Sequence, residues 1–298
     1  MEWKITEFEN QMILRDFLRM CVGLSRNMIK VLKYDGGKIL LNGQTVNVRE
    51  RLATGDQIEL QFPKEERGPQ LIPEPINLDI VYEDEFLIVV NKPAKMATIP
   101  STHHRSKTVA NGLIAHYDQL DLDYTVHVVT RLDRDTSGLM LIAKQRFCHS
   151  FFHQQKIERH YQAVVEGKPE KTAGVGVIDA PIARKPDSII ERTVSKGGKP
   201  AVTHYQVIRH VKCGSIVDIK LETGRTHQIR VHFAHIGHPL VGDKLYGGST
   251  VHVDRQALHC VYLSFIHPIT KKRIQLKSDW PADLSQITDC EPQPQNGE

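Results

Sequence analysis

The chain has 298 residues, of which 40% are hydrophobic and 25% charged, a composition typical of a folded globular protein and not of a disordered one. This length predicts one or two domains. A formal net charge of +4 permits an RNA or phosphate partner without requiring one. The five cysteines never form a CxxC pair, which argues against a disulfide scaffold and a structural zinc ribbon. No apolar stretch could span a bilayer, and the charged start lacks the core of a secretory signal, so we expect a cytoplasmic protein without membrane contact.

Residues 12–62 predict a small unit of mixed α and β structure. Apolar residues at helical spacing predict a helix over residues 14–21, and Ser25 can cap a second helix. Asn42-Gly43 lies between two apolar runs, which indicates a hairpin with a type I′ turn. Alternating apolar residues at 58–62 then predict a half-buried strand.

Basic side chains gather on the outer faces of the two predicted helices. They are Arg15, Arg19, Arg26, Lys30 and Lys33. A solvated helix surface would show the same charges. However, two short helices followed by a hairpin and a strand resemble the alpha-L RNA-binding module first known from a ribosomal protein. In that module the basic helix pair contacts RNA phosphates, so the resemblance implies that these five residues bind RNA.

The remainder of the chain predicts a linker, a large domain and a tail. Residues 63–76 are polar and rich in proline, which is typical of a linker. Residues 77–284 hold many strand-like segments and few helical ones, in no strict βαβ rhythm. This pattern predicts an α+β domain with a bent, mainly antiparallel mixed sheet flanked by helices. Residues 291–298 predict a disordered tail.

Polar residues 131–138 come directly before an apolar strand, a typical position for a site on a rigid support. Asp133 and Asp135 would point to opposite sides of an extended chain, so a close acid/base pair is not expected. A solvated turn accounts for either aspartate alone. A D-x-D metal site, as in nucleotide-sugar transferases, is an alternative, but Asp121 and Asp123 repeat the same pattern elsewhere.

A second polar segment surrounds Arg225 and Arg230, where a predicted strand is followed by a predicted helix that includes His232. Such a junction presents free N–H groups and fixed cations, which suit a phosphate or a carboxylate. His232, His235 and His238 suggest zinc, but no acid or cysteine completes a known ligand spacing. Histidines that pack around a turn are the simpler interpretation.

Tyr161 follows a basic, helix-like run and begins a strand, and a lone tyrosine there is commonly a core aromatic. Three motifs in order change this interpretation: R-L-D-x-x-T-S-G from Arg131, Y-x-A-x-V-E-G from Tyr161 and T-G-R-T-H-Q-I-R-V-H from Thr223. Together with N-K-P from Asn91 and P-L-V-G-D-x-x-Y-G from Pro239, they resemble the pseudouridine synthases of the large-subunit ribosomal RNA family. With the alpha-L module, the resemblance covers nearly the whole chain.

The resemblance implies an isomerase that breaks the bond from uridine nitrogen 1 to the ribose and rejoins the uracil through carbon 5, with no cofactor and no metal. It assigns the catalytic carboxylate to Asp133, the aromatic that stacks on the base to Tyr161, and the cation paired with the carboxylate to Arg225. We further expect Arg131 and Arg230 to contact RNA. A guanidinium partner favours an ionised carboxylate, and an aromatic face offsets the lost stacking of a flipped base. Attack at carbon 6 and a sugar-centred mechanism both stay open.

Two departures leave the subfamily open: Thr130 stands where many relatives have histidine, and His160 where many have lysine or arginine. Large-subunit ribosomal RNA is the first choice of substrate and transfer RNA the second. The alternative function is a non-catalytic RNA-binding or ribosome-associated factor, against which the joint presence of Asp133, Tyr161 and Arg225 argues. We expect a monomer whose partner is RNA.

Overall fold

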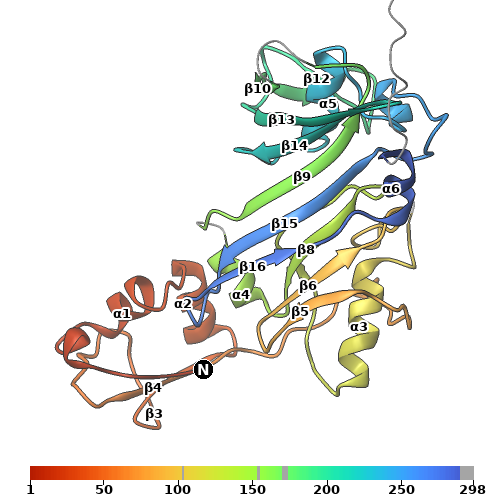
Figure 1. Ribbon diagram of the computed structural model, residues 1–298. Coiled ribbons are helices and arrows are strands. Elements are labelled where there is room, and N and C mark those ends of the chain that lie inside the picture. The colour runs from red at the N-terminus through yellow and green to blue at the C-terminus, as the bar shows by residue number, and fades with distance from the viewer. Residues whose placement is uncertain (103, 153–154, 170–173, 289–298) are drawn as a thin grey trace, which may run out of the picture.

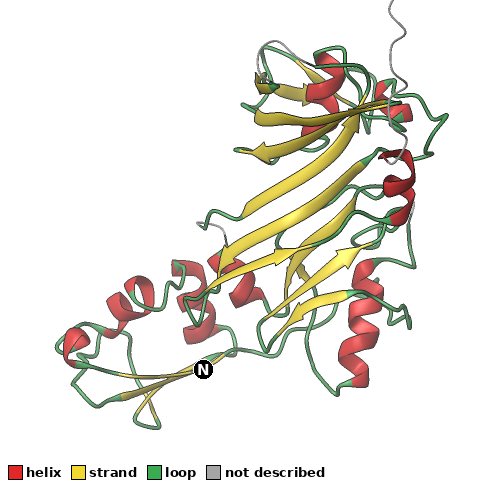
Figure 2. Cartoon of the chain, viewed as in Figure 1, coloured by secondary structure: helices red, strands yellow, loops and turns green. Residues whose placement is uncertain are grey.

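The computed structural model describes residues 1–102, 104–152, 155–169 and 174–288. The chain forms a small N-terminal unit and a larger unit built on one long, twisted sheet (Figure 1). Strands dominate the larger unit, and its helices lie at the margins of the sheet (Figure 2). Within the described residues, no helix is long and apolar enough to cross a membrane. The predicted α+β class with a mainly antiparallel mixed sheet is confirmed.

The N-terminal unit contains both predicted helices and the predicted hairpin. Its elements are β1 (Glu2–Lys4), η1 (Glu7–Glu9), α1 (Leu14–Met20), α2 (Arg26–Tyr34), β2 (Lys38–Leu41), β3 (Gln44–Thr45) and β4 (Gln57–Gln61), with the sheet order β1-β4-β2-β3. Ser25 caps α2, because its Oγ accepts the Met28 N–H at 3.1 Å. Asn42 and Gly43 have φ values of 53° and 80°, as a type I′ turn requires.

Residues before position 12 also belong to this unit. β1 pairs antiparallel with β4, with Trp3 opposite Ile58, and the Met1 ammonium donates a hydrogen bond to the Leu60 carbonyl at 3.0 Å. A three-residue strand is too short to show alternation, so its sequence carries no periodic signal.

The larger unit holds a ten-stranded sheet whose main path runs β10-β13-β14-β9-β15-β8-β6-β5, with β16 paired to β15 and β7 to β8. The strands are β5 (Ile80–Glu83), β6 (Leu87–Lys92), β7 (His127–Val128), β8 (Ser137–Ala143), β9 (Glu158–Val165), β10 (Val175–Asp179), β13 (Val202–Val211), β14 (Gly214–Leu221), β15 (Leu258–Ile266) and β16 (Arg273–Lys277). A separate hairpin joins β11 (Ile182–Arg184) to β12 (Arg192–Val194). The helices are α3 (Val109–Gln119), α4 (Arg146–Phe151), α5 (Gln228–His235), η2 (Lys244–Tyr246) and α6 (Ala282–Thr288). Within the described sheet, only the β8–β15 pair is parallel.

Gly138 allows β8 and β15 to lie unusually close at the start of β8. Its φ is 115°, and a Cβ there would lie 2.4 Å from the backbone nitrogen of Cys260. All seven residues of β8 are buried. The glycine of the R-L-D-x-x-T-S-G motif therefore lets a buried strand begin directly after the polar turn.

Residues 63–76, expected as a linker, lie against the larger unit and are fixed to it. Glu65 contacts the His127 ring at 2.7 Å, and Arg67 donates hydrogen bonds to the carbonyls of Tyr124 and Leu122 at 2.9 and 3.0 Å. Beside this segment, the Phe62 and Phe147 rings stack with centroids 4.0 Å apart. The segment therefore connects the two units while it is bound to the larger one. Its prolines prevent a helix, but its charged side chains find fixed partners.

Two local predictions are wrong. The predicted helix that includes His232 begins earlier than expected, because α5 starts at Gln228, and its residues from Gln228 to Phe233 are all buried. Polar and apolar residues alternate along this buried part of α5, so the sequence shows no apolar helix face there. Tyr161 lies inside β9 and not at its start, because β9 begins at Glu158. Residues 291–298 lie outside the described residues.

His259 gives the fold a specific acid sensitivity. It is 1% exposed, and its two ring nitrogens contact the hydroxyls of Ser137 and Ser278 at 2.8 and 3.0 Å. Burial lowers the pKa of His259 from 6.5 to about 4. Since the unfolded chain takes up this proton first, the stability contributed by neutral His259 is complete above pH 6.5 and is lost as the pH falls toward 4.

We expect this residue alone to lower the free energy of unfolding by up to about 3 kcal/mol over that interval. Urea denaturation at a series of pH values would show the loss in the wild type, and the His259→Gln variant should lack this component. An identical pH dependence in both proteins would contradict the prediction.

Candidate active site

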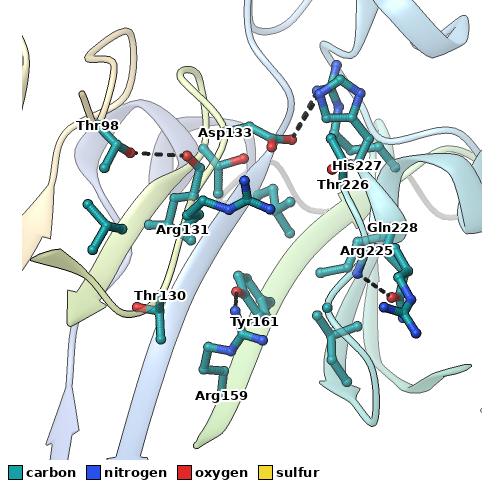
Figure 3. Close-up of a pocket in the computed structure, with 18 of the residues that line it drawn as sticks. Thr98, Thr130, Arg131, Asp133, Arg159, Tyr161, Arg225, Thr226, His227 and Gln228 are labelled. Atoms are coloured by element: carbon teal, nitrogen blue, oxygen red, sulfur yellow. Dashed lines mark hydrogen bonds and ion pairs between the residues drawn. The ribbon is translucent and has the colours of Figure 1, made fainter. Parts of the chain in front are cut away.

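A cavity of about 660 Å³ lies where the turn before β8, the middle of β9 and the turn before α5 meet (Figure 3). Its described lining contains five arginines and one carboxylate: Arg131, Arg134, Arg159, Arg225, Arg230 and Asp133. The structure therefore brings the three sequence motifs to one basic cavity, although β9 and α5 are far apart in the chain.

Lys92 fixes the turn that carries Asp133. The lysine is 1% exposed, and its Nζ donates hydrogen bonds to the carbonyls of Pro93, Met96 and Arg134 at 2.9, 3.0 and 2.9 Å. Burial lowers the pKa of Lys92 to about 7. The three carbonyl acceptors favour the opposite, charged form, because an ammonium group has three N–H donors. Lys92 belongs to the N-K-P motif, to which sequence analysis gave no role.

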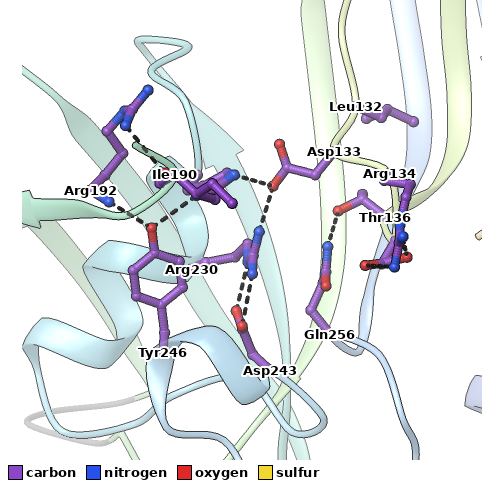
Figure 4. A network of polar contacts seen from close by, with 12 residues as sticks. Leu132, Asp133, Arg134, Thr136, Ile190, Arg192, Arg230, Asp243, Tyr246 and Gln256 are labelled. Atoms are coloured by element: carbon purple, nitrogen blue, oxygen red, sulfur yellow. Dashed lines mark hydrogen bonds and ion pairs between the residues drawn. The ribbon is translucent and has the colours of Figure 1, made fainter. Parts of the chain in front are cut away.

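Arg230 joins Asp133 to a second, buried carboxylate. Its Nη1 donates to Asp133 Oδ2 at 3.1 Å, and its Nε and Nη2 donate to the two oxygens of Asp243 at 2.7 and 2.8 Å (Figure 4). Burial disfavours the positive charge of the Arg230 guanidinium, but the hydrogen bonds and negative charges of the two aspartates outweigh burial and raise the pKa of Arg230. Within the described residues, Asp133 Oδ1 accepts no hydrogen bond, so this oxygen is free in the cavity.

The predicted pairing of Arg225 with Asp133 is wrong. Arg225 is exposed at the rim, where its Nε donates to the Pro200 carbonyl at 3.0 Å and its backbone N–H donates to Gln228 Oε1 at 2.9 Å. Because α5 begins at Gln228, Arg225 precedes the helix and Arg230 faces inward from it. The expected contact of Arg230 with RNA stays a prediction; in this structure its guanidinium binds two carboxylates.

Tyr161 lies beside Asp133 in the cavity lining and is 4% exposed. Arg159, two residues earlier on β9 and therefore on the same face, donates from Nη1 to the Tyr161 hydroxyl at 3.4 Å (Figure 3). Burial raises the pKa of Tyr161, so its hydroxyl stays protonated. Sequence analysis did not identify Arg159.

The two departures from the family pattern do not touch the Asp133 carboxylate. The Thr130 hydroxyl accepts the Leu141 N–H at 2.8 Å and so supports β8. His160 contacts Glu158 at 3.1 Å, and by strand alternation its side chain points away from the face that carries Tyr161.

Neither metal hypothesis gains support from the contacts. Asp135 pairs with Arg134 at 2.9 and 3.1 Å and does not share the position of Asp133. The His232 nitrogens contact the Thr203 hydroxyl and the Ala180 carbonyl, each at 2.9 Å. Among the described residues, no group of three or more His, Cys, Asp or Glu side chains is arranged to hold a metal ion.

A second cavity, of about 720 Å³, lies in the N-terminal unit between α1, α2 and residues 47–49. We call it the basic groove; its basic lining residues are Arg15, Arg19, Arg26, Lys30, Lys33 and Arg49. The structure thus gathers all five basic residues that sequence analysis had singled out. It adds Arg49 and the exposed Tyr34, whose ring centroid lies 4.5 Å from Lys33 Nζ. No acidic residue is among the described lining residues.

A single carboxylate among arginines, together with a basic groove in the adjoining unit, is typical of a protein that binds nucleic acid. Residues 86–235 match the family described as RNA pseudouridylate synthase. The chain belongs to this family, as its predicted motifs indicated.

Relatives and solved structures agree with this assignment. An uncharacterized RNA pseudouridine synthase of Bacillus subtilis, YjbO, is 46% identical over 270 residues, which cover 89% of this chain and 95% of that protein. Ribosomal large subunit pseudouridine synthase D of Escherichia coli K12 is 38% identical over 282 residues, covering 88% of this chain and 85% of that protein. The structure of human RNA pseudouridylate synthase domain containing 1 has a TM-score of 0.57 and 25% identity, and covers 69% of this chain and 84% of that one.

Proposed function

We propose that this protein converts a uridine of large-subunit ribosomal RNA to pseudouridine, with Asp133 as the reacting carboxylate and Tyr161 as the aromatic side chain beside the base. In this reaction the bond from nitrogen 1 to the ribose breaks and a bond from carbon 5 to the ribose forms. Carbon 5 loses a proton and nitrogen 1 gains one. The reaction is an isomerisation, so it needs no oxidant, group donor or cofactor.

The observation that carries this proposal is how the two oxygens of the Asp133 carboxylate are bound. Arg230 holds Oδ2, and Oδ1 is free in a cavity that Tyr161 also lines. The Arg230 guanidinium orients the carboxylate through a charge-assisted hydrogen bond. A uridine inside folded RNA must leave its stack to reach such a cavity, and an aromatic side chain offsets part of that cost.

Release of tritium from RNA that carries tritiated uridine at carbon 5 tests the activity. We expect release that continues in EDTA. A protein that binds RNA without releasing tritium would support the non-catalytic alternative. Activity that continues in EDTA would exclude the nucleotide-sugar transferase, which requires a divalent metal.

The choice of RNA rests on the name of the Escherichia coli relative, which acts on the large ribosomal subunit. We further propose that the protein acts as a monomer in the cytoplasm. Carbodiimide-based mapping of pseudouridines in cells with and without the protein tests the substrate. Loss of a ribosomal site is the expected result, and loss of a transfer RNA site instead would overturn the choice.

The N-terminal unit is proposed to be an alpha-L RNA-binding domain that holds RNA phosphates in its basic groove. Six exposed cations line this groove and support this role. Of these, Arg15 lies 3.4 Å from an acidic side chain, Asp16, which is not part of the described lining. Phosphate contacts position the RNA and give affinity, whereas the chemistry lies elsewhere.

Replacing Arg19, Lys30 and Lys33 together by alanine should weaken RNA binding and flatten its salt dependence. Each lost phosphate contact removes about 0.7 to 0.9 from the slope of log affinity against log salt, so we expect a total change of about two. Turnover at saturating RNA should stay within about twofold, because the carboxylate is untouched. Lys38→Ala, an exposed lysine of the same unit outside the groove, is the control. An unchanged salt slope in the triple variant would contradict the RNA-binding role.

A further inference from the structure

His227 lies directly before α5 in a backbone conformation that residues with a Cβ rarely adopt. Its φ of 56° and ψ of 21° are left-handed, and its side chain does not cap the helix. Such a conformation costs free energy for a residue other than glycine, although histidine adopts it more often than most residues do. The imidazole of His227 has two polar neighbours, the Tyr246 hydroxyl and the Asp133 carboxylate.

The Tyr246 hydroxyl fixes which ring nitrogen carries the proton. His227 Nδ1 lies 2.9 Å from Tyr246 Oη, and this oxygen already accepts the Arg192 backbone N–H at 2.9 Å. Among the described residues, Nδ1 is the acceptor available to the Tyr246 proton. The neutral ring therefore carries its proton on Nε2.

The protonated nitrogen faces the catalytic carboxylate. His227 Nε2 lies 3.8 Å from Asp133 Oδ2, the oxygen that Arg230 already holds at 3.1 Å. Nε2 carrying a lone pair would repel the carboxylate, which is a second reason for the Nε2–H form. A separation of 3.8 Å is too long for a hydrogen bond, but catalytic contacts often shorten only when the substrate binds.

Charged groups face the imidazole from several elements: Asp133 from the turn before β8, Arg230 from α5, Arg192 from β12, and Asp243 and Tyr246 from the segment around η2. Burial lowers the pKa of His227, and the two arginines lower it further. The two aspartates raise it, but by less. The ring is therefore neutral near pH 7, where its single proton is placed by Tyr246.

On the basis of the proposed function, we propose that His227 is a positioning residue for the catalytic carboxylate. Its Nε2–H and the Arg230 guanidinium together hold Asp133 Oδ2, so that Oδ1 is the oxygen that reacts with the target uridine. Tyr246 acts through His227 by orienting the ring. The T-H-Q-I-R motif thus supplies two donors, His227 and Arg230, three residues apart on one side of the helix start.

His227→Asn and His227→Gln form a matched pair. Asparagine tolerates the left-handed backbone, but its amide is too short to reach Asp133; the glutamine amide extends about as far as Nε2. We expect the single-turnover rate at saturating RNA to fall about 10- to 100-fold in His227→Asn and to recover to within about fivefold in His227→Gln. Melting temperature and RNA affinity should change little. Wild-type turnover in His227→Asn would overturn the proposal, as would equal losses in both variants.

Tyr246→Phe tests the orienting step through its pH dependence. Without the hydroxyl, the neutral ring can place its proton on either nitrogen, whereas the protonated ring carries a hydrogen on both. The rate of Tyr246→Phe relative to wild type should therefore rise as the pH falls from about 8 to 5.5. The losses in Tyr246→Phe and His227→Asn should not add in the double variant. A constant rate ratio and additive losses would overturn the role of Tyr246.

Nitrogen-15 NMR of histidine-labelled protein gives a readout that is independent of activity. With the His227 signal assigned by comparison with His227→Asn, we expect the Nε2–H form at pH 7.5. The Nδ1–H form would overturn the proposal even if the enzyme is active. Absence of tritium release from wild-type protein with the Nε2–H form intact would instead count against the proposed function.

Discussion

Replacement of Asp133 by asparagine is expected to abolish isomerisation while RNA still binds. The amide keeps the shape of the side chain but lacks the ionised oxygen that is free in the cavity. The loss should reach at least about 10⁴-fold in turnover, as for other essential reacting groups. Tritium release under single-turnover conditions measures the rate, and filter binding of the same RNA measures affinity.

Asp135→Asn is the matched control, because Asp135 belongs to the same turn and pairs with Arg134. Asp135 is not among the described residues that line the cavity, so most of the activity should remain. Substantial turnover in Asp133→Asn would contradict the assignment of the reacting group. A comparable loss in both variants would indicate that the turn as a whole had been disturbed.

The N-terminal unit was predictable because local signals agree with its tertiary structure. Ser25 caps α2, Asn42-Gly43 forms the hairpin turn, and each helix buries three apolar residues of its inner face. The first strand was missed because β1 has three residues and gains its stability only by pairing with β4. Such pairing joins segments that are far apart in the sequence, which no local pattern reveals.

The cavity was predictable in its motifs but not in its contacts. Asp133 and Tyr161 meet there as the resemblance implied, whereas Arg225 does not reach the carboxylate. The resemblance assigned the paired cation to Arg225, but α5 begins at Gln228 and Arg230 is the residue that reaches the carboxylate. In the observed helix, His227 and Arg230 lie three residues apart, and a helical interpretation of T-H-Q-I-R would have placed both on one face.

The segment 63–76 shows a different limit of sequence reasoning. Composition identified a proline-rich polar stretch, and such stretches commonly connect domains. Yet Glu65 and Arg67 bind partners on the larger unit, and the stacked Phe62 and Phe147 rings join the two cores. Composition indicates how residues 63–76 would behave in isolation. Whether the segment binds to the larger unit depends on the side chains and carbonyls that the folded unit places next to it.

Arg230→Met should both destabilise the protein and abolish turnover. Methionine keeps much of the apolar stem but leaves Asp133 and the buried Asp243 without their shared cation. Removal of one partner from a buried ion pair costs about 3 to 5 kcal/mol, which urea denaturation would measure. Arg225→Ala is the control: its side chain is exposed at the rim, so stability should change by less than about 0.5 kcal/mol.

Adding Asp243→Asn to Arg230→Met separates the two effects. The second change removes the uncompensated buried charge, so the double variant should recover much of the lost stability. Turnover should remain absent, because Asp133 Oδ2 still lacks the guanidinium that holds it. If activity returned together with stability, Arg230 would serve only to neutralise Asp243. If Arg225→Ala lost turnover as completely as Arg230→Met, the cation that supports catalysis would be Arg225, brought to the carboxylate only when RNA binds.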